Sequence, residues 1–166
     1  DVGGEGVGTL NISSGGRLAG EDLTVDSSDE NDVSTLALSG LVDEGDAKLD
    51  VGFTLVVGNR ADGQLEMQGN TLLTTEFAVL GALPDSFGLA TAAGDADFSP
   101  GNGKSSSLKA RQFLLVGQQG SGRFTTRGLS DHTYGALLLG GGASGAGTYS
   151  AEGVLNFTSV ENDLIV

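Results

Sequence analysis

The feature that most constrains this chain is a pattern that repeats along it. An apolar run is followed by a glycine, a short polar turn and an alternating run that ends near another glycine. Clear copies begin at Leu55, Leu114 and Leu137. One copy is too short to bury its own apolar residues, so successive copies are expected to stack and share a core. The repeat is more typical of a structural scaffold than of an enzyme.

The spacing of the repeat is regular when the position after each apolar run is taken as its phase. The phase positions are Gly3, Asp26, Gly58, Gly81, Gly117 and Gly140. The intervals between them are 23, 32, 23, 36 and 23 residues, and the last apolar run predicts a further phase at position 167. Short and long intervals alternate, which predicts three two-turn units in a single β-solenoid domain spanning 1–166. The predicted units are approximately 3–57, 58–116 and 117–166, with a loop insertion at approximately 82–107.

Apolar and polar residues alternate within each unit, as they do in a β-strand with one buried face. Stacking would align the apolar residues into ladders. The expected ladder residues are Leu10, Ile12, Leu36, Leu38, Leu65, Met67, Phe124 and Tyr149. Corner glycines supply positive φ, and frequent glycine makes long helices costly. The predicted fold class is all-β: a single-stranded right-handed parallel β-helix (β-solenoid) of about six to seven turns, with the hand that parallel crossovers prefer.

Composition excludes several classes of protein. The 38% of hydrophobic residues can form a core, which argues against a disordered acidic tail. There is no cysteine, so a disulfide framework, a thiolate metal site and a cysteine nucleophile are impossible. A net charge of −14 argues against nucleic acid as the partner. No apolar run is long enough to predict a membrane span.

The residue pattern of the repeat resembles that of known bacterial surface proteins. The matching stretches are 6–18, 57–69, 116–128 and 139–156, which include Leu-Leu-Val-Gly and Gly-Gly-Gly-Ala-Ser-Gly-Ala-Gly-Thr-Tyr. They resemble autotransporter-type passenger repeats, in particular the Gly-Thr-Leu-rich β-helical repeats of large bacterial surface proteins. The resemblance implies an exported, extracellular or cell-surface β-helical protein that is adhesive or matrix-forming.

Catalytic patterns are weak, and no catalytic or cofactor-binding residue is predicted. The single histidine, His132, is expected to face solvent in a loop. Paired carboxylates deserve a test because some β-helices cleave polysaccharides, and glycosidases hold two carboxyl groups about 5–10 Å apart. The candidates are Glu21 with Asp22, the group Asp43, Glu44, Asp46 and Asp50, and Asp95 with Asp97. The chain has no tryptophan to line a sugar cleft, so we expect no enzyme.

Calcium is the one cofactor that the sequence suggests, and no other is expected. Residues 21–50 hold ten carboxylates, and oxygen clusters suit this cation. The weak candidate ligands are Asp26, Asp29 and Asp32. This segment lacks both the EF-hand spacing and the glycine-rich nonapeptide of calcium β-rolls, so a solvated acidic loop is the simpler interpretation.

The ends of the chain suggest self-association. The chain begins inside one repeat and stops one residue before an expected phase position. Either it is a fragment of a longer adhesin, or the last turn docks on the first turn of another copy and the stack continues as a homopolymer. The predicted contact residues are Val2, Gly3, Leu164, Ile165 and Val166. The leading hypothesis is a non-enzymatic structural or adhesive protein that assembles head to tail into filaments. A carbohydrate-binding or carbohydrate-cleaving β-helix with a surface glycan as partner is the alternative.

Overall fold

In the computed structural model the chain is all-β. Residues 1–29, 32–40, 46–93 and 106–165 are described, and they form eleven strands and no helix. The strands are β1 (Val2–Gly3), β2 (Thr9–Ser13), β3 (Arg17–Asp26), β4 (Val33–Gly40), β5 (Ala47–Val57), β6 (Asp62–Gly69), β7 (Thr71–Leu80), β8 (Phe87–Ala93), β9 (Ser106–Val116), β10 (Ser121–Leu139) and β11 (Ala146–Ile165).

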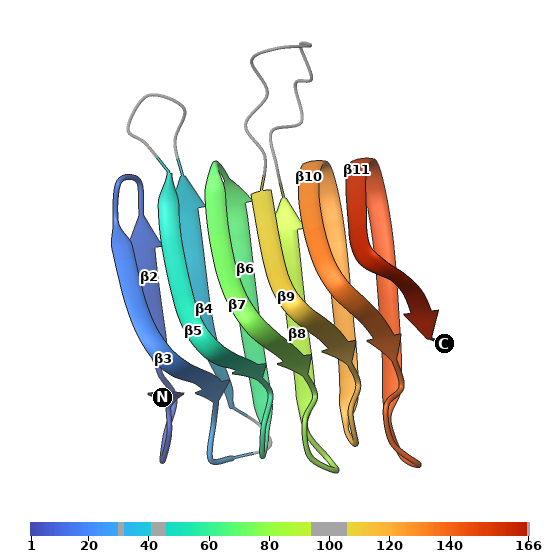
Figure 1. Ribbon diagram of the computed structural model, residues 1–166. Helices are drawn as coiled ribbons and strands as arrows, with labels where there is room; N and C mark the ends of the chain where they lie inside the picture. The colour runs from blue at the N-terminus through green and yellow to red at the C-terminus, as the bar shows by residue number, and fades with distance from the viewer. Residues whose placement is uncertain (30–31, 41–45, 94–105, 166) are drawn as a thin grey trace.

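The strands lie in two rows, and within each row all neighbouring strands pair in parallel (Figure 1). The first row contains β2, β4, β6, β8 and the first half of β10. The second row contains β1, β3, β5, β7, β9 and the second half of β10. β11 pairs along both halves of β10. The prediction of an all-β fold built from parallel strands is therefore confirmed.

The register of the second row follows the phase inferred from the sequence. Gly3 pairs with Asp26. The residues just before the later phase positions pair in one continuous column, which runs Val25, Val57, Leu80, Val116 and Leu139. At the last step Leu138 pairs with Ile165, which is the register that a phase at position 167 requires. The irregular intervals of the sequence thus correspond to regular stacking.

The first row carries the predicted core ladders. One column runs Leu10, Leu36, Leu65, Ala90, Phe124 and Tyr149. A second column begins with Ile12, Leu38, Met67 and Ala92. The central members of both columns are buried, while Leu10 and Tyr149 are partly buried and pack against them. All eight predicted ladder residues therefore lie in two adjacent columns.

The second row closes the core from the other side and bends along its length. Its inward column includes the buried residues Leu49, Leu73 and Leu108. The strand register then shifts between Val51 and Thr54 in β5, and between Thr75 and Phe77 in β7. β10 shifts likewise within Tyr134–Ala136. These aligned irregularities let each strand turn while its side chains stay in register with the next strand.

The predicted loop insertion at approximately 82–107 needs a correction. β8 lies inside it and pairs with β6 on one side and β10 on the other, so Phe87–Ala93 is a member of the first row. Ser106 and Ser107 likewise belong to β9. The sequence does not indicate this strand, because its inward residues, Ala90 and Ala92, are small. Residues 94–105, within the same prediction, lie outside the described residues.

Glycines at the phase positions join successive turns at one corner. Gly58 has φ of 72° and its N–H donates to the carbonyl of Val25, one turn earlier, at 2.9 Å. Gly81, Gly117 and Gly140 repeat both features. A Cβ at Gly58 would also overlap the backbone carbonyl of Phe87 in the following turn. Glycine is required here by conformation and by close backbone approach.

The corner makes a first prediction. Gly58→Ala should lower the free energy of unfolding by at least about 2 kcal/mol, because the new Cβ imposes both left-handed strain and a backbone clash. Gly20→Ala is the matched control, since a Cβ at Gly20 meets nothing within 4 Å and Gly20 is exposed in β3. Urea denaturation of both variants measures the difference. Equal stability of the two would show that the corner does not need glycine.

Candidate functional site

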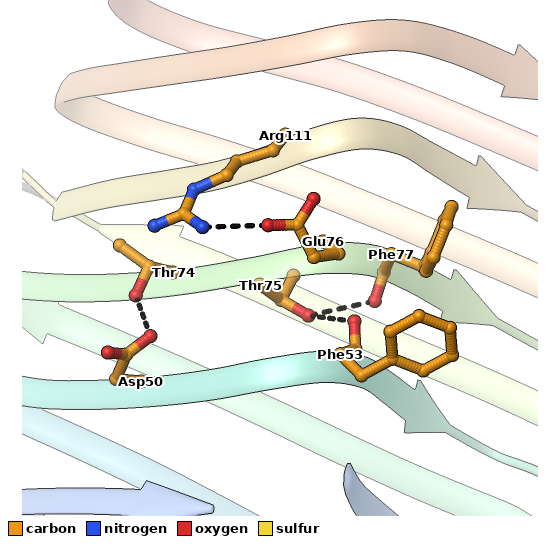
Figure 2. Close-up of polar contacts among 7 residues, drawn as sticks. All are labelled: Asp50, Phe53, Thr74, Thr75, Glu76, Phe77 and Arg111. Carbon is orange, nitrogen blue, oxygen red and sulfur yellow. Dashed lines mark hydrogen bonds and ion pairs between the residues drawn. The ribbon is translucent and has the colours of Figure 1, made fainter. Parts of the chain in front are cut away.

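The outer side of β5, β7 and β9 carries an array of polar contacts between neighbouring strands. Figure 2 shows this array near the bend of the strands. The Thr74 hydroxyl donates to the Asp50 carboxylate at 2.6 Å, and the Arg111 guanidinium donates to the Glu76 carboxylate at 2.7 Å. Beneath this surface the hydroxyl of Thr75, which is buried, donates to the carbonyl of Phe53 at 3.1 Å and ties the bends of β5 and β7 together. These contacts fix the spacing of neighbouring strands on the surface.

Three phenylalanines form a ladder on the same side of the molecule. The ring centroids of Phe53 and Phe77 are 5.1 Å apart with an interplanar angle of 78°, and those of Phe77 and Phe113 are 4.9 Å apart. Phe53 is 53% exposed, and the other two rings are half-buried. Such edge-to-face and tilted pairs stabilise adjacent turns by about 0.5–1.5 kcal/mol each. One aromatic face of the ladder remains available to a partner.

A second apolar cluster lies close to this ladder and outside the main core. Val79 and Leu115 are buried in it together with Ala82, and Val56, Phe113 and Leu138 pack against them. Gly141 lies over Leu115, because a Cβ there would touch the leucine side chain. The corner loop that contains Gly141 therefore covers part of this second cluster. The phenylalanine ladder lies beside the cluster and stays partly exposed.

His132 is buried within β10, so the prediction of a solvent-facing loop histidine is wrong. It follows Leu49, Leu73 and Leu108 in the inward column of the second row. Its ring packs edge-on against Phe124, with centroids 5.3 Å apart, and stacks on Tyr134. Neither ring nitrogen has a hydrogen-bond partner among the described residues. Burial lowers the pKa of His132 to about 4, so the imidazole is neutral near neutral pH.

Two tyrosines complete this interior aromatic group. Tyr134 is fully buried in β10, and Tyr149 lies on β11 with its ring 5.2 Å from that of Phe124. Burial raises the pKa of Tyr134, and the nearby Tyr149 hydroxyl adds to the rise. Burial also raises the pKa of Tyr149 to about 12, an effect that the hydrogen bond with Tyr134 opposes. Both phenols are protonated at ordinary pH, which suits a packed core better than acid–base chemistry.

Asp26 occupies the one phase position that lacks glycine, and its side chain caps the next turn. Its carboxylate accepts the backbone N–H groups of Asn59 at 3.1 Å, Arg60 at 3.0 Å and Ala61 at 3.0 Å. Asp26 is only 6% exposed. A carboxylate that accepts three converging amides is a strong local stabiliser. The spacing of the repeat predicts the place of Asp26 among the phase positions, but no sequence signal indicates this capping role.

The weak calcium candidates do not form a cation cage in the described structure. Asp26 points its carboxylate at backbone amides, which are donors that a cation would have to displace. Asp29 and Asp32 are exposed, and the Asp32 N–H donates to the Asp29 carbonyl at 3.1 Å. In the part of the chain that is described, no three acidic or histidine side chains group as a metal site would require.

The carboxylates considered for catalysis are held in separate structural contacts. Asp22 accepts the backbone N–H of Thr54 at 3.1 Å, while Asp46 pairs with Lys48 at 3.2 Å and accepts a hydrogen bond from Asn70. Asp50 accepts from Thr74, as described above. Glu21, the partner of Asp22 in the prediction, is exposed in β3. The other candidates, Asp43, Glu44, Asp95 and Asp97, lie outside the described residues.

The predicted self-association residues lie at opposite ends of the strand rows. Val2 and Gly3 form β1, which within the described residues pairs with the last residues of β3. Leu164 and Ile165 lie in β11 and pair with Leu137 and Leu138 of β10. Val166 lies outside the described residues. In the described part of the chain, β11 has β10 as its only paired strand.

Comparison with protein-family models, with characterised proteins and with solved structures finds no match to this chain. Across the described residues there is no helix with the length and hydropathy that crossing a bilayer would require. Functional inference therefore depends on the surfaces and contacts of the chain itself.

The buried histidine predicts a pH dependence of stability. In the unfolded chain His132 titrates near 6.5, whereas in the folded chain burial lowers its pKa to about 4. The unfolded state therefore binds a proton first, and stability is lost as pH falls from about 6.5 to about 4. His132→Leu, which matches the leucines of its column, should remove about 2–3 kcal/mol of this loss between pH 7 and pH 4.5. Urea denaturation of both proteins at both pH values measures it. An identical pH dependence would contradict burial of a neutral imidazole.

The capped turn gives a third prediction. Asp26→Ala should lower the free energy of unfolding by about 2–4 kcal/mol, because three backbone amides lose a charged acceptor. Asp32→Ala removes a carboxylate from the same loop and is the control, since its side chain is exposed. We expect its effect to stay within about 0.5 kcal/mol. Thermal or urea unfolding distinguishes the two, and equal losses would argue against the cap.

Proposed function

We propose that the chain is a stretch of single-stranded, right-handed parallel β-solenoid with six to seven turns, and that it serves as a non-enzymatic structural or adhesive element that associates head to tail. The observation that carries this proposal is the parallel register of the second row, which continues from β1 to β11 across aligned irregularities, so that each turn is the template for the next. A structure built by templating is extended by the same contacts at its ends.

The end of the stack at β3 supports this proposal. Residues Arg17–Asp22 are all exposed, and the apolar side chains of Leu18, Leu23, Leu49 and Val51 line a shallow hollow there. This hollow exposes the edge of the core, which would be buried if another turn were added. The other end presents β11, whose residues Leu164 and Ile165 follow Leu137 and Leu138 in their columns. A second copy placed by its β11 against β3 would continue the stack.

The use of charged side chains also favours a scaffold. Asp26 caps a turn, Glu76 pairs with Arg111, and Asp50 bonds Thr74. Each of these contacts joins two neighbouring turns. An extracellular or bacterial cell-surface location, within a surface layer or matrix, belongs to this proposal and rests on the resemblance of the repeats. The carbohydrate-binding alternative and the origin as a passenger fragment stay predictions.

Head-to-tail association predicts assemblies whose length grows with protein concentration. Leu18→Lys should stop this growth, because it places a charge in the hollow at the β3 end. Leu83→Lys is the matched control: Leu83 is 42% exposed, close to the 39% of Leu18, but it lies in a corner loop. Negative-stain microscopy and sedimentation velocity detect the assemblies. Particles of wild-type protein that stay monomeric at every concentration would overturn the proposal, as would equal growth of both variants.

A further inference from the structure

The N-terminal segments of β3, β5, β7 and β9, with the matching part of β10, present a narrow outer face that we call the charged face. It consists of two columns of outward residues. The first column is Arg17, Lys48, Leu72, Ser107 and Asp131, and the second is Ala19, Asp50, Thr74, Lys109 and Thr133. Ser107 takes part by its register alone, because its side chain is buried. The alternate residues Leu49, Leu73 and Leu108 are buried, which turns these columns away from the core.

The charges on this face change sign across β7. In the second column Asp50 lies one strand before Thr74, and Lys109 lies one strand after it. In the first column Arg17 lies two strands before Leu72, and Asp131 lies two strands after it. Strands in a sheet are evenly spaced, so Asp50 and Lys109, and likewise Arg17 and Asp131, sit at equal distances on either side of β7. Lys48 has uncharged Ser107 at the equivalent place and pairs with Asp46 of its own chain at 3.2 Å.

This antisymmetry makes the face complementary to itself. A two-fold axis along β7 reverses the order of the strands while it keeps each residue at its height along the strand. It therefore brings Asp50 of one copy opposite Lys109 of a second copy, and Arg17 opposite Asp131. Each pair occurs twice, because the interface is isologous. Half-buried Leu72 and Thr74 would meet their own counterparts at the centre.

We propose that two copies of this chain pair through their charged faces, related by a two-fold axis along β7. The bend of the strands adds a contact at the border: Arg111 on β9 would lie over Phe53 of the second copy, where a guanidinium can stack on an exposed ring (Figure 2). The contact surface is narrow, so the dimer belongs to the weak class, with a dissociation constant of roughly 1–100 μM.

This lateral pairing does not depend on the head-to-tail association proposed above. The two use different surfaces, and a two-fold contact closes at two copies whereas head-to-tail contact does not close. Measuring the dimer in both the wild-type and the Leu18→Lys backgrounds separates them. The Leu18→Lys variant should lose filaments and keep the dimer. A wild-type chain that forms the dimer but no filaments would count against the head-to-tail proposal only, and filaments without a dimer in the Leu18→Lys background would count against the lateral pairing only.

The test is a charge exchange between strands. Asp50→Lys should weaken dimerisation at least about tenfold, because both Asp50–Lys109 pairs become repulsive, and Lys109→Asp should do the same. The double variant restores opposite charges and should return the dissociation constant to within about threefold of wild type. Both residues are exposed, so the variants should fold, which circular dichroism confirms. Sedimentation equilibrium at about 0.15 M salt limits the repulsion from the net charge.

Matched controls carry the same charge changes on the outer face of the first row. Glu66→Lys and Arg123→Asp change exposed residues of β6 and β10 and should leave the dissociation constant within about threefold of wild type. The proposal is overturned if the wild-type chain is monomeric at about 500 μM, well above the expected dissociation constant. It is also overturned if the double variant fails to recover, or if the controls weaken the dimer equally.

Discussion

The parallel register between successive turns is the constraint on which the rest of this structure depends. In a parallel sheet each residue faces the equivalent residue of the next turn, and a slip by one residue would send every inward side chain outward. At one corner the N–H of each phase glycine from Gly58 onward donates to a carbonyl one turn earlier. These hydrogen bonds fix the register at the place where the chain changes direction, and the strands on both sides keep that register.

The same register explains how the core is filled. Residues of one column pack against each other in the core, so a small side chain in one turn can be compensated by a large side chain in the next. Ala90 lies between Leu65 and Phe124 in its column, and the ring of Phe124 reaches both His132 and Tyr149. Near β10 and β11 the core changes from aliphatic to aromatic. There the neutral imidazole of His132 takes the place that leucine holds in earlier turns.

The outside of the molecule is organised by columns as well. The contacts between Asp50 and Thr74 and between Glu76 and Arg111 join neighbouring turns, and they stand beside a ladder of phenylalanines. On the charged face Asp50 and Lys109, and likewise Arg17 and Asp131, lie on opposite sides of β7, because position along the sequence becomes position along the stack. The two modes of self-association that we propose, end to end and face to face, use these two features of one architecture.

Much of the fold could be predicted from the sequence, because the repeat has a phase. The phase positions at Gly3, Asp26, Gly58, Gly81, Gly117 and Gly140 and the two core ladders follow from counting alone, and the register confirms them. What counting missed depends on neighbours in space.

β8 was hidden because Ala90 and Ala92 make no apolar signal, and their burial depends on larger residues in adjacent turns. The burial of His132 was missed because a polar residue on an inward position looks like a surface residue until the column is known. The cap by Asp26 joins residues 33 to 35 positions apart, and no local pattern encodes it.

The most direct test of this structure is to probe the strand register by disulfide cross-linking. The chain has no native cysteine, so only the introduced pair can cross-link within it. Thr35 of β4 and Gln64 of β6 are paired outward residues, and Glu66 lies two positions further along β6. Paired Cα atoms of adjacent strands are about 5 Å apart, within disulfide range, whereas the diagonal pair exceeds about 7 Å. Under mild oxidation the variant with cysteines at 35 and 64 should cross-link within the chain and keep its fold, while the variant with cysteines at 35 and 66 should stay reduced. Equal cross-linking of the two, or faster cross-linking of the second, would contradict the register.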